Sequence, residues 1–125
     1  MSAGLARYPG RAPIDAYGNG GFRFAEMSHR GSLLCLPSGI YAWDAARAED
    51  LTPATLGPIL AERPALGFLI FGTGLTQVFP GAALRQAFAD AGLGLEVMST
   101  GAACRTYNVL LAEGRPVGAA LIAVD

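Results

Sequence analysis

The sequence contains no lysine, two cysteines and a single histidine, and each scarcity excludes a class of site. A phosphate-binding P-loop is excluded because its lysine must contact the nucleotide phosphates. The two cysteines lie 69 positions apart, and with one histidine they match neither a disulfide scaffold nor a zinc site. We therefore expect no metal, no cofactor and a reducing, cytoplasmic location.

Charge is also scarce, with 15% charged residues and a net charge of −1. The nine basic residues are all arginines scattered along the chain, which argues against binding of nucleic acid. The longest apolar runs, "FLIF" and "VGAALIAV", are too short for a membrane span, and the N-terminus has no continuous hydrophobic segment typical of a secretory signal. So few charges leave part of the surface apolar, which favours a protein partner or a homodimer.

A length of 125 residues predicts a single domain over 1–125, with 1–13 as an irregular or strand-like N-terminal arm. The first third has the pattern of a β-meander, because short alternating runs are separated by Gly, Asn and Pro. In the segment 21–27, "GFRFAEM", Phe22, Phe24 and Glu26 alternate with Arg23, which predicts one strand covered on one face. The expected strands are 14–17, 21–27, 31–37 and 39–44.

From residue 52 onward the pattern alternates between helices and strands. Thr52 as N-cap, Pro53 at the first helical position and Pro64 as the stop predict the first helix. Further helices are expected at 80–92 and at 101–114, the latter capped by Thr100, with strands at 67–72, 95–98 and 116–124. This order predicts an α/β (α+β) fold of three layers, with a mixed central sheet flanked by helices and an N-terminal β-hairpin layer.

The Gly72-Thr73-Gly74 bend follows the buried strand "FLIF" and is the first candidate site. Ligands of open α/β sheets collect at the carboxyl ends of strands, where a glycine-rich turn presents N–H groups to an anion. The dinucleotide fingerprint is absent, since no third glycine follows at the required spacing. The bend is interpreted first as a tight corner and alternatively as an anion nest.

The segment "TGAACRTYN" is the second candidate site. On a helix, Thr100, Cys104 and Asn108 share a face, while Arg105 lies about 100° round the axis. A nucleophilic cysteine requires an adjacent base, and the single histidine, His29, is expected as an exposed turn residue in the hairpin region. Cys104 is therefore expected to be a small buried residue, and no catalytic residue is assigned.

These fragments together resemble the family of mitochondrial complex I assembly factor 3 and its bacterial and archaeal homologues. The likeness rests on "IDAYGNGGFRF", "FLIFGTG", "GAACRTYNVLLAEGR" and "GAALI", in that order, over about residues 14–122. The resemblance implies a compact three-layer domain of unknown function with no established enzymatic activity. For the mitochondrial branch it implies a role in assembling respiratory complex I at the inner membrane through binding of other proteins.

Two functions remain open at this point. The first is a non-enzymatic protein-binding or assembly-factor module in a bacterial cytoplasm, with respiratory or membrane-complex subunits as partners. The alternative is a small-anion or metabolite-binding protein or enzyme, in which the glycine turn donates N–H groups and Arg105 or Arg115 supplies charge. The candidate ligand or partner surface comprises Gly72, Thr73, Gly74, Thr100, Cys104, Arg105, Tyr107, Asn108 and Arg115.

Overall fold

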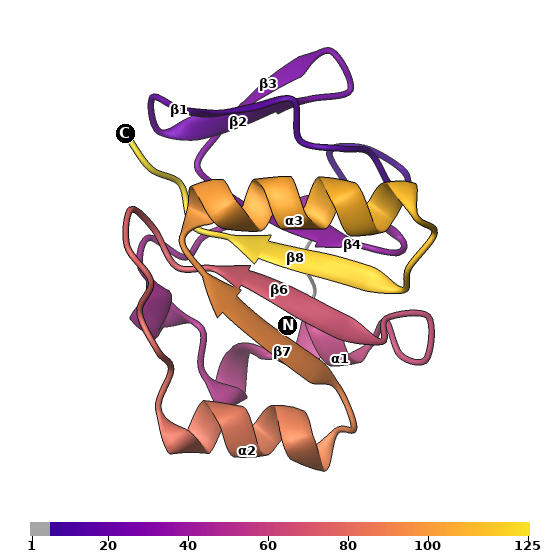
Figure 1. The fold of residues 1–125 in the computed structure, drawn as a ribbon, viewed down its shortest axis with the longest axis vertical. Coiled ribbons are helices and arrows are strands. Elements are labelled where there is room, and N and C mark those ends of the chain that lie inside the picture. The colour runs from indigo at the N-terminus through magenta and orange to yellow at the C-terminus, as the bar shows by residue number, and fades with distance from the viewer. Residues whose placement is uncertain (1–5) are drawn as a thin grey trace.

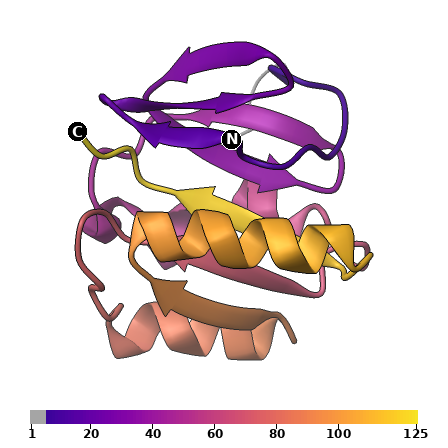
Figure 2. The same ribbon diagram turned by 45° about the horizontal axis from the view of Figure 1, so that its top comes forward.

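In the computed structural model, which describes residues 6–125, a five-stranded sheet is accompanied by a smaller three-stranded sheet (Figures 1 and 2). The strands are β1 (Ala16–Gly18), β2 (Gly21–Phe24), β3 (Met27–Arg30), β4 (Ser32–Leu36), β5 (Gly39–Trp43), β6 (Phe68–Gly72), β7 (Gly94–Met98) and β8 (Val117–Leu121). The helices are α1 (Gly57–Leu60), α2 (Ala82–Asp90) and α3 (Thr100–Ala112), and two 3₁₀ turns are η1 (Ala48–Asp50) and η2 (Pro53–Thr55).

The five-stranded sheet is mixed, as predicted, with the order β5-β4-β8-β6-β7. Strands β6, β7 and β8 are parallel, whereas β4 pairs antiparallel with both β5 and β8. In Figure 1 the arrowheads of β6, β7 and β8 point to the same side, and α3 begins on that side. The carboxyl ends of β6 and β7 therefore lie at one edge of the sheet.

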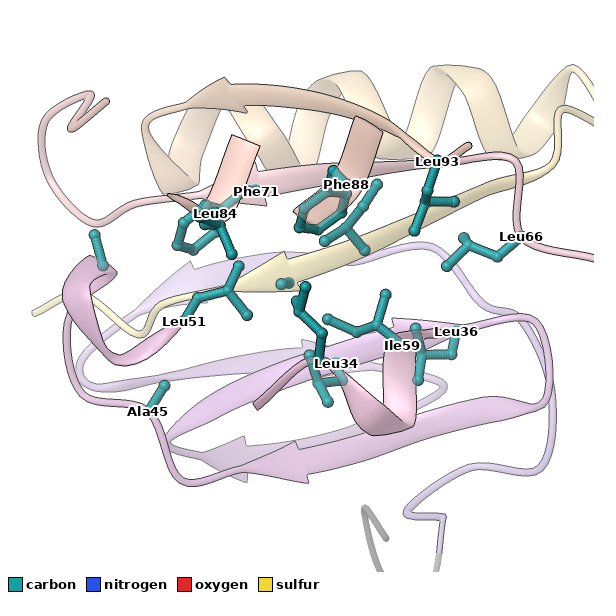
Figure 3. Close-up of a cluster of buried hydrophobic side chains, with 14 of the residues drawn as sticks. Leu34, Leu36, Ala45, Leu51, Ile59, Leu66, Phe71, Leu84, Phe88 and Leu93 are labelled. Carbon is teal, nitrogen blue, oxygen red and sulfur yellow. The ribbon is translucent and has the colours of Figure 1, made fainter. Parts of the chain in front are cut away.

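Both faces of the five-stranded sheet are covered, because successive side chains of its strands point to opposite sides. Leu69 and Phe71 of β6 pack with α1 and α2, and Figure 3 shows this cluster with Leu84 and Phe88 of α2. Ile70 packs on the other face, with α3 and the three-stranded sheet. The predicted three-layer arrangement with an N-terminal hairpin layer is confirmed.

The segment 21–27 differs from the prediction of one strand. Ala25 and Glu26 have φ angles of 49° and 61° and form a turn between β2 and β3. Phe22 and Phe24 are buried and Arg23 is exposed, as the alternation predicts, but Glu26 lies in the turn. The sequence conceals this hairpin because neither turn residue is glycine or asparagine.

The predicted first helix is also interrupted. Thr52 and Pro53 begin the turn η2, and only the single-turn helix α1 follows. Pro58 has no N–H to donate to the fourth preceding carbonyl, and its ring clashes with that turn. A continuous helix from residue 53 is therefore excluded.

The N-terminal arm lies beside strand β5. Residues 1–5 of the arm expected over 1–13 fall outside the described residues. The Tyr8 carbonyl accepts from the Ile40 N–H at 3.0 Å, and the two residues form an isolated antiparallel bridge. Among residues 6–125, no helix combines the length and apolar character that a bilayer crossing requires.

Candidate functional site

The Gly72-Thr73-Gly74 bend and the start of α3 meet at the carboxyl edge of the sheet. The Gly74 N–H donates to Thr100 Oγ1 at 3.0 Å, and the Thr100 N–H donates to the Gly74 carbonyl at 2.8 Å. Thr100 Oγ1 in turn donates to the Ile122 carbonyl at 2.7 Å. One buried hydroxyl thus joins the ends of β6 and β8 to the first turn of α3.

Gly72 permits this close approach of helix to strand. A Cβ atom at residue 72 would lie 3.0 Å from both the Thr100 Cα and the Ala103 Cβ. The N–H groups that follow are already engaged, since Thr73 donates to the Met98 carbonyl at 2.9 Å and Gly74 donates to Thr100. The bend is therefore a corner of the backbone, and these two donors bond within the protein.

Thr73 organises the loop that leaves the bend. Its buried hydroxyl donates to the Thr76 carbonyl at 2.7 Å and accepts from the Val78 N–H at 3.0 Å. The loop so held displays two large apolar side chains, because Leu75 is 78% exposed and Phe79 is 76% exposed. Among the described residues, Leu75 and Phe79 are the two most exposed large apolar side chains.

Cys104 is buried in the core between α3 and the sheet, together with Tyr107 and Cys35. Burial raises the pKa of the Cys104 thiol to about 12, although Arg105 lowers it slightly. The expected burial of Cys104 is confirmed. A thiol that is protonated at neutral pH is a weak nucleophile, because the thiolate is the reactive form.

His29 was expected in an exposed turn, and the structure corrects this expectation. His29 is buried in β3, opposite Phe22, and its Nε2 donates to the Ser32 carbonyl at 3.2 Å. Desolvation lowers the pKa of the imidazole, and nearby Arg7 lowers it further, while the hydrogen bond to Ser32 opposes both. The burial follows from the missed hairpin, which turns this side chain toward the core.

Asn108 has a structural task on α3. Its Oδ1 accepts from the Ile14 N–H and its Nδ2 donates to the Ile14 carbonyl, both at 2.8 Å. These two bonds fasten the chain segment that precedes β1 to the helix. The N-cap of α3 is Ser99 and not Thr100, because the Thr100 hydroxyl is directed to Ile122 and Gly74.

The two candidate arginines lie apart from each other. Arg105 is exposed on the second turn of α3, whereas Arg115 follows the end of the helix. The Arg115 guanidinium lies 5.6 Å from the ring centroid of Phe68, at the amino end of β6. Since a strand rises about 3.3 Å per residue, Arg115 is roughly 13 Å along β6 from Gly72. The structure therefore does not bring Arg115 to the glycine turn.

The candidate set thus divides into three groups. Gly72, Thr73, Gly74 and Thr100 form the corner; Cys104, Tyr107 and Asn108 hold α3 in place; Arg105 and Arg115 lie at separate positions. The exposed apolar loop formed by 75–79 was not among the predicted sites. The available signal was that Leu75 and Phe79, two large apolar residues, lie between the predicted strand 67–72 and the predicted helix 80–92.

Several known proteins are similar to this chain. An uncharacterised protein of Rhodobacter capsulatus is 38% identical over 92% of this chain and 87% of its own length. The mouse NADH dehydrogenase (ubiquinone) 1 alpha subcomplex assembly factor 3 is 30% identical over 94% of this chain. This chain spans only 63% of the length of that assembly factor.

A solved structure shows the same fold over nearly the whole chain. The crystal structure described as an outer membrane protein from Bartonella henselae is 50% identical, with a TM-score of 0.90. The match covers 95% of this chain and 100% of that one. A family model described as "Protein of unknown function (DUF498/DUF598)" matches residues 14–122, and the chain belongs to this family.

Proposed function

We propose that this chain is a non-enzymatic protein-binding module of the assembly-factor kind, which docks a partner through Leu75 and Phe79. The observation that carries the proposal is the high exposure of these two side chains on a loop that the Thr73 hydroxyl holds in place. A loop ordered before binding loses little conformational entropy on docking. Large apolar side chains on such a loop are suited to fill pockets of a partner.

The similarity to an assembly factor of NADH dehydrogenase supports the choice of partner. We propose subunits of a respiratory or membrane complex as partners, and the cytoplasm as the compartment. Cys35 and Cys104 are both free and buried, which suits a reducing environment. Buried free thiols act here as core residues.

The test is recovery of respiratory subunits from the native host with tagged protein, quantified by mass spectrometry. We expect the wild-type chain to recover NADH dehydrogenase subunits and the double variant Leu75→Ser/Phe79→Ser to recover them at least about tenfold less. Val109→Ser is the matched control, because Val109 is a 58% exposed apolar residue on α3. Equal recovery by the double variant, or no recovery by any form, would contradict the proposal.

The anion-binding alternative predicts a different response. A ligand that binds only the folded state raises its stability with concentration, so phosphate or sulfate would raise the melting temperature. We expect no such rise, because the N–H groups of Thr73 and Gly74 already have partners. A phosphate-dependent rise that Arg105→Ala abolishes would favour the alternative.

A further inference from the structure

Strand β7 is an open edge of the five-stranded sheet. Within residues 6–125 it pairs only with β6, whereas the opposite edge, β5, is bridged by the arm at Tyr8 and Ile40. An edge strand presents N–H and C=O groups that can pair with another chain. The two edges thus differ in whether the chain itself covers them.

The pairing with β6 fixes which groups of β7 face outward. In a parallel strand the N–H and C=O of one residue point to the same side, and successive residues alternate. The Gly94 N–H donates to the Gly67 carbonyl at 3.2 Å and the Met98 carbonyl accepts from Thr73, so both residues face β6. Leu95 and Val97, which alternate with them, therefore direct their N–H and C=O groups away from the sheet.

Gln77 covers one of these outward groups. Its Nε2 donates to the Val97 carbonyl at 2.8 Å. No hydrogen bond to the Leu95 N–H, the Leu95 carbonyl or the Val97 N–H from outside β7 occurs in the described part of the chain. The edge thus offers two donors and one acceptor, and the exposed Gln77 side chain bonds to the second acceptor.

A groove of mixed polarity runs beside this edge, between β7 and α2. It has a volume of about 490 Å³, and its lining combines apolar residues, among them Phe79, Leu95 and Val97, with the polar residues Gln77, Arg85 and Glu96. A strand that paired with β7 would place alternate side chains on this side of the sheet. The exposed ring of Phe79, which belongs to the proposed docking loop, borders the same groove.

Glu96 adds a charge to the edge. It lies between Leu95 and Val97, is exposed, and has no ion-pair partner among residues 6–125. Opposite charges directly across two strands stabilise their pairing, and like charges destabilise it. An antiparallel pair of two copies centred on Glu96 would place two carboxylates opposite each other, with Cα atoms about 4.5 Å apart. The edge therefore favours a foreign strand with a basic residue over a second copy in that register.

From these observations we infer that β7 binds an extended segment of the partner protein as an added strand. The segment carries an apolar side chain for the groove and an arginine or lysine opposite Glu96. This inference rests on the proposed function and specifies how the partner is held. Main-chain hydrogen bonds to Leu95 and Val97 provide the affinity, and the groove and Glu96 provide the selectivity.

The test begins with selection of random dodecapeptides displayed on phage against the wild-type protein, followed by synthesis of the best binder. We expect the selected peptides to contain apolar residues that alternate with a basic residue. We also expect amide hydrogen exchange at Leu95 and Val97 of the protein to slow when the peptide binds. Leu95→Pro should weaken binding about tenfold relative to Leu95→Ala, because both variants lose the side chain and only proline removes the outward N–H. Glu96→Lys should weaken it about fivefold, and Glu113→Lys, on the exposed end of α3, should have no effect.

Three results would overturn strand addition. The first is that no peptide is selected. The second is that Leu95→Pro and Leu95→Ala bind the peptide with equal affinity and that the Leu95 and Val97 amides are not protected from exchange. The third is that the free protein forms a dimer that Leu95→Pro abolishes. If Leu95→Pro does not fold, the Glu96→Lys comparison and the exchange rates of wild-type protein decide the question. If strand addition is overturned but recovery of respiratory subunits still depends on Phe79, the proposed function stands and only the proposed mode of binding is wrong.

Discussion

The hydroxyl of Thr100 is the polar group on which the junction of β6, β8 and α3 depends, so Thr100→Val is the sharpest test of the corner. Valine keeps the shape and volume of the buried side chain but removes its hydrogen bonds. The Gly74 N–H then loses its acceptor at 3.0 Å, and the Ile122 carbonyl loses its donor at 2.7 Å. The change in the free energy of unfolding of this variant therefore measures the contribution of the Thr100 hydrogen bonds.

The expected loss of stability follows from burial. A buried group left without a partner costs about 1–3 kcal/mol. Thr100 and Ile122 are buried, while Gly74 is half-buried and can bind water, so its cost lies at the low end. We expect the free energy of unfolding to fall by about 2–4 kcal/mol, a large part of the roughly 5–15 kcal/mol of an ordinary domain.

Urea denaturation monitored by circular dichroism measures this change. With a slope of about 2 kcal/mol/M, the midpoint should fall by about 1–2 M and the slope should stay constant. Thr100→Ser keeps both hydrogen bonds and should lose about 1 kcal/mol for its methyl group. Thr106→Val is the matched control on the same helix, since Thr106 is half-buried and should change stability by about 0.5 kcal/mol or less. A loss for Thr100→Val no larger than that for Thr106→Val would refute the reasoning.

Two further predictions concern titratable groups. Because burial raises the pKa of Cys104 to about 12 and also raises the pKa of fully buried Cys35, neither thiol should react with iodoacetamide at pH 8 in the folded protein. Both should react in urea, and mass spectrometry that finds rapid labelling of folded protein would contradict the burial argument. The lowered pKa of His29 means that the unfolded chain binds its proton more readily, so stability should fall as pH drops below about 6.5 and level off below the lowered native pKa. Urea midpoints between pH 7.5 and 5.5 should show this fall in the wild type and not in His29→Gln, and parallel curves would refute it.

The sequence by itself determined the order of the elements after residue 66. The apolar run 68–71, the periodicity of α2 and the glycine that ends α3 are local signals, and each depends only on neighbouring residues. The mixed sheet followed from the alternation of helices and strands, because parallel strands require helical crossovers. The resemblance to a known family was also contained in the order of short motifs.

Other features were decided by tertiary structure. The hairpin at Ala25 and Glu26 forms although neither residue favours positive φ, because the covered face of the three-stranded sheet fixes the register of β2 and β3. His29 is buried for the same reason. Whether Thr100 caps its helix or bonds to Ile122 depends on where β8 lies, and β8 is distant in sequence.

The candidate site shows the same division. The sequence located the bend at Gly72 and the start of α3, since both follow from local patterns at strand ends. Only the packing determines which of their hydrogen-bonding groups remain without a partner. The Thr100 hydroxyl accepts a hydrogen bond from the Gly74 N–H, and the Asn108 side chain accepts one from the Ile14 N–H. The exposure of Phe79 and the open edge of β7 depend on strand order, which local residue patterns cannot specify. Local chemistry thus placed the elements along the chain, and long-range packing determined which of their surfaces remained for a partner.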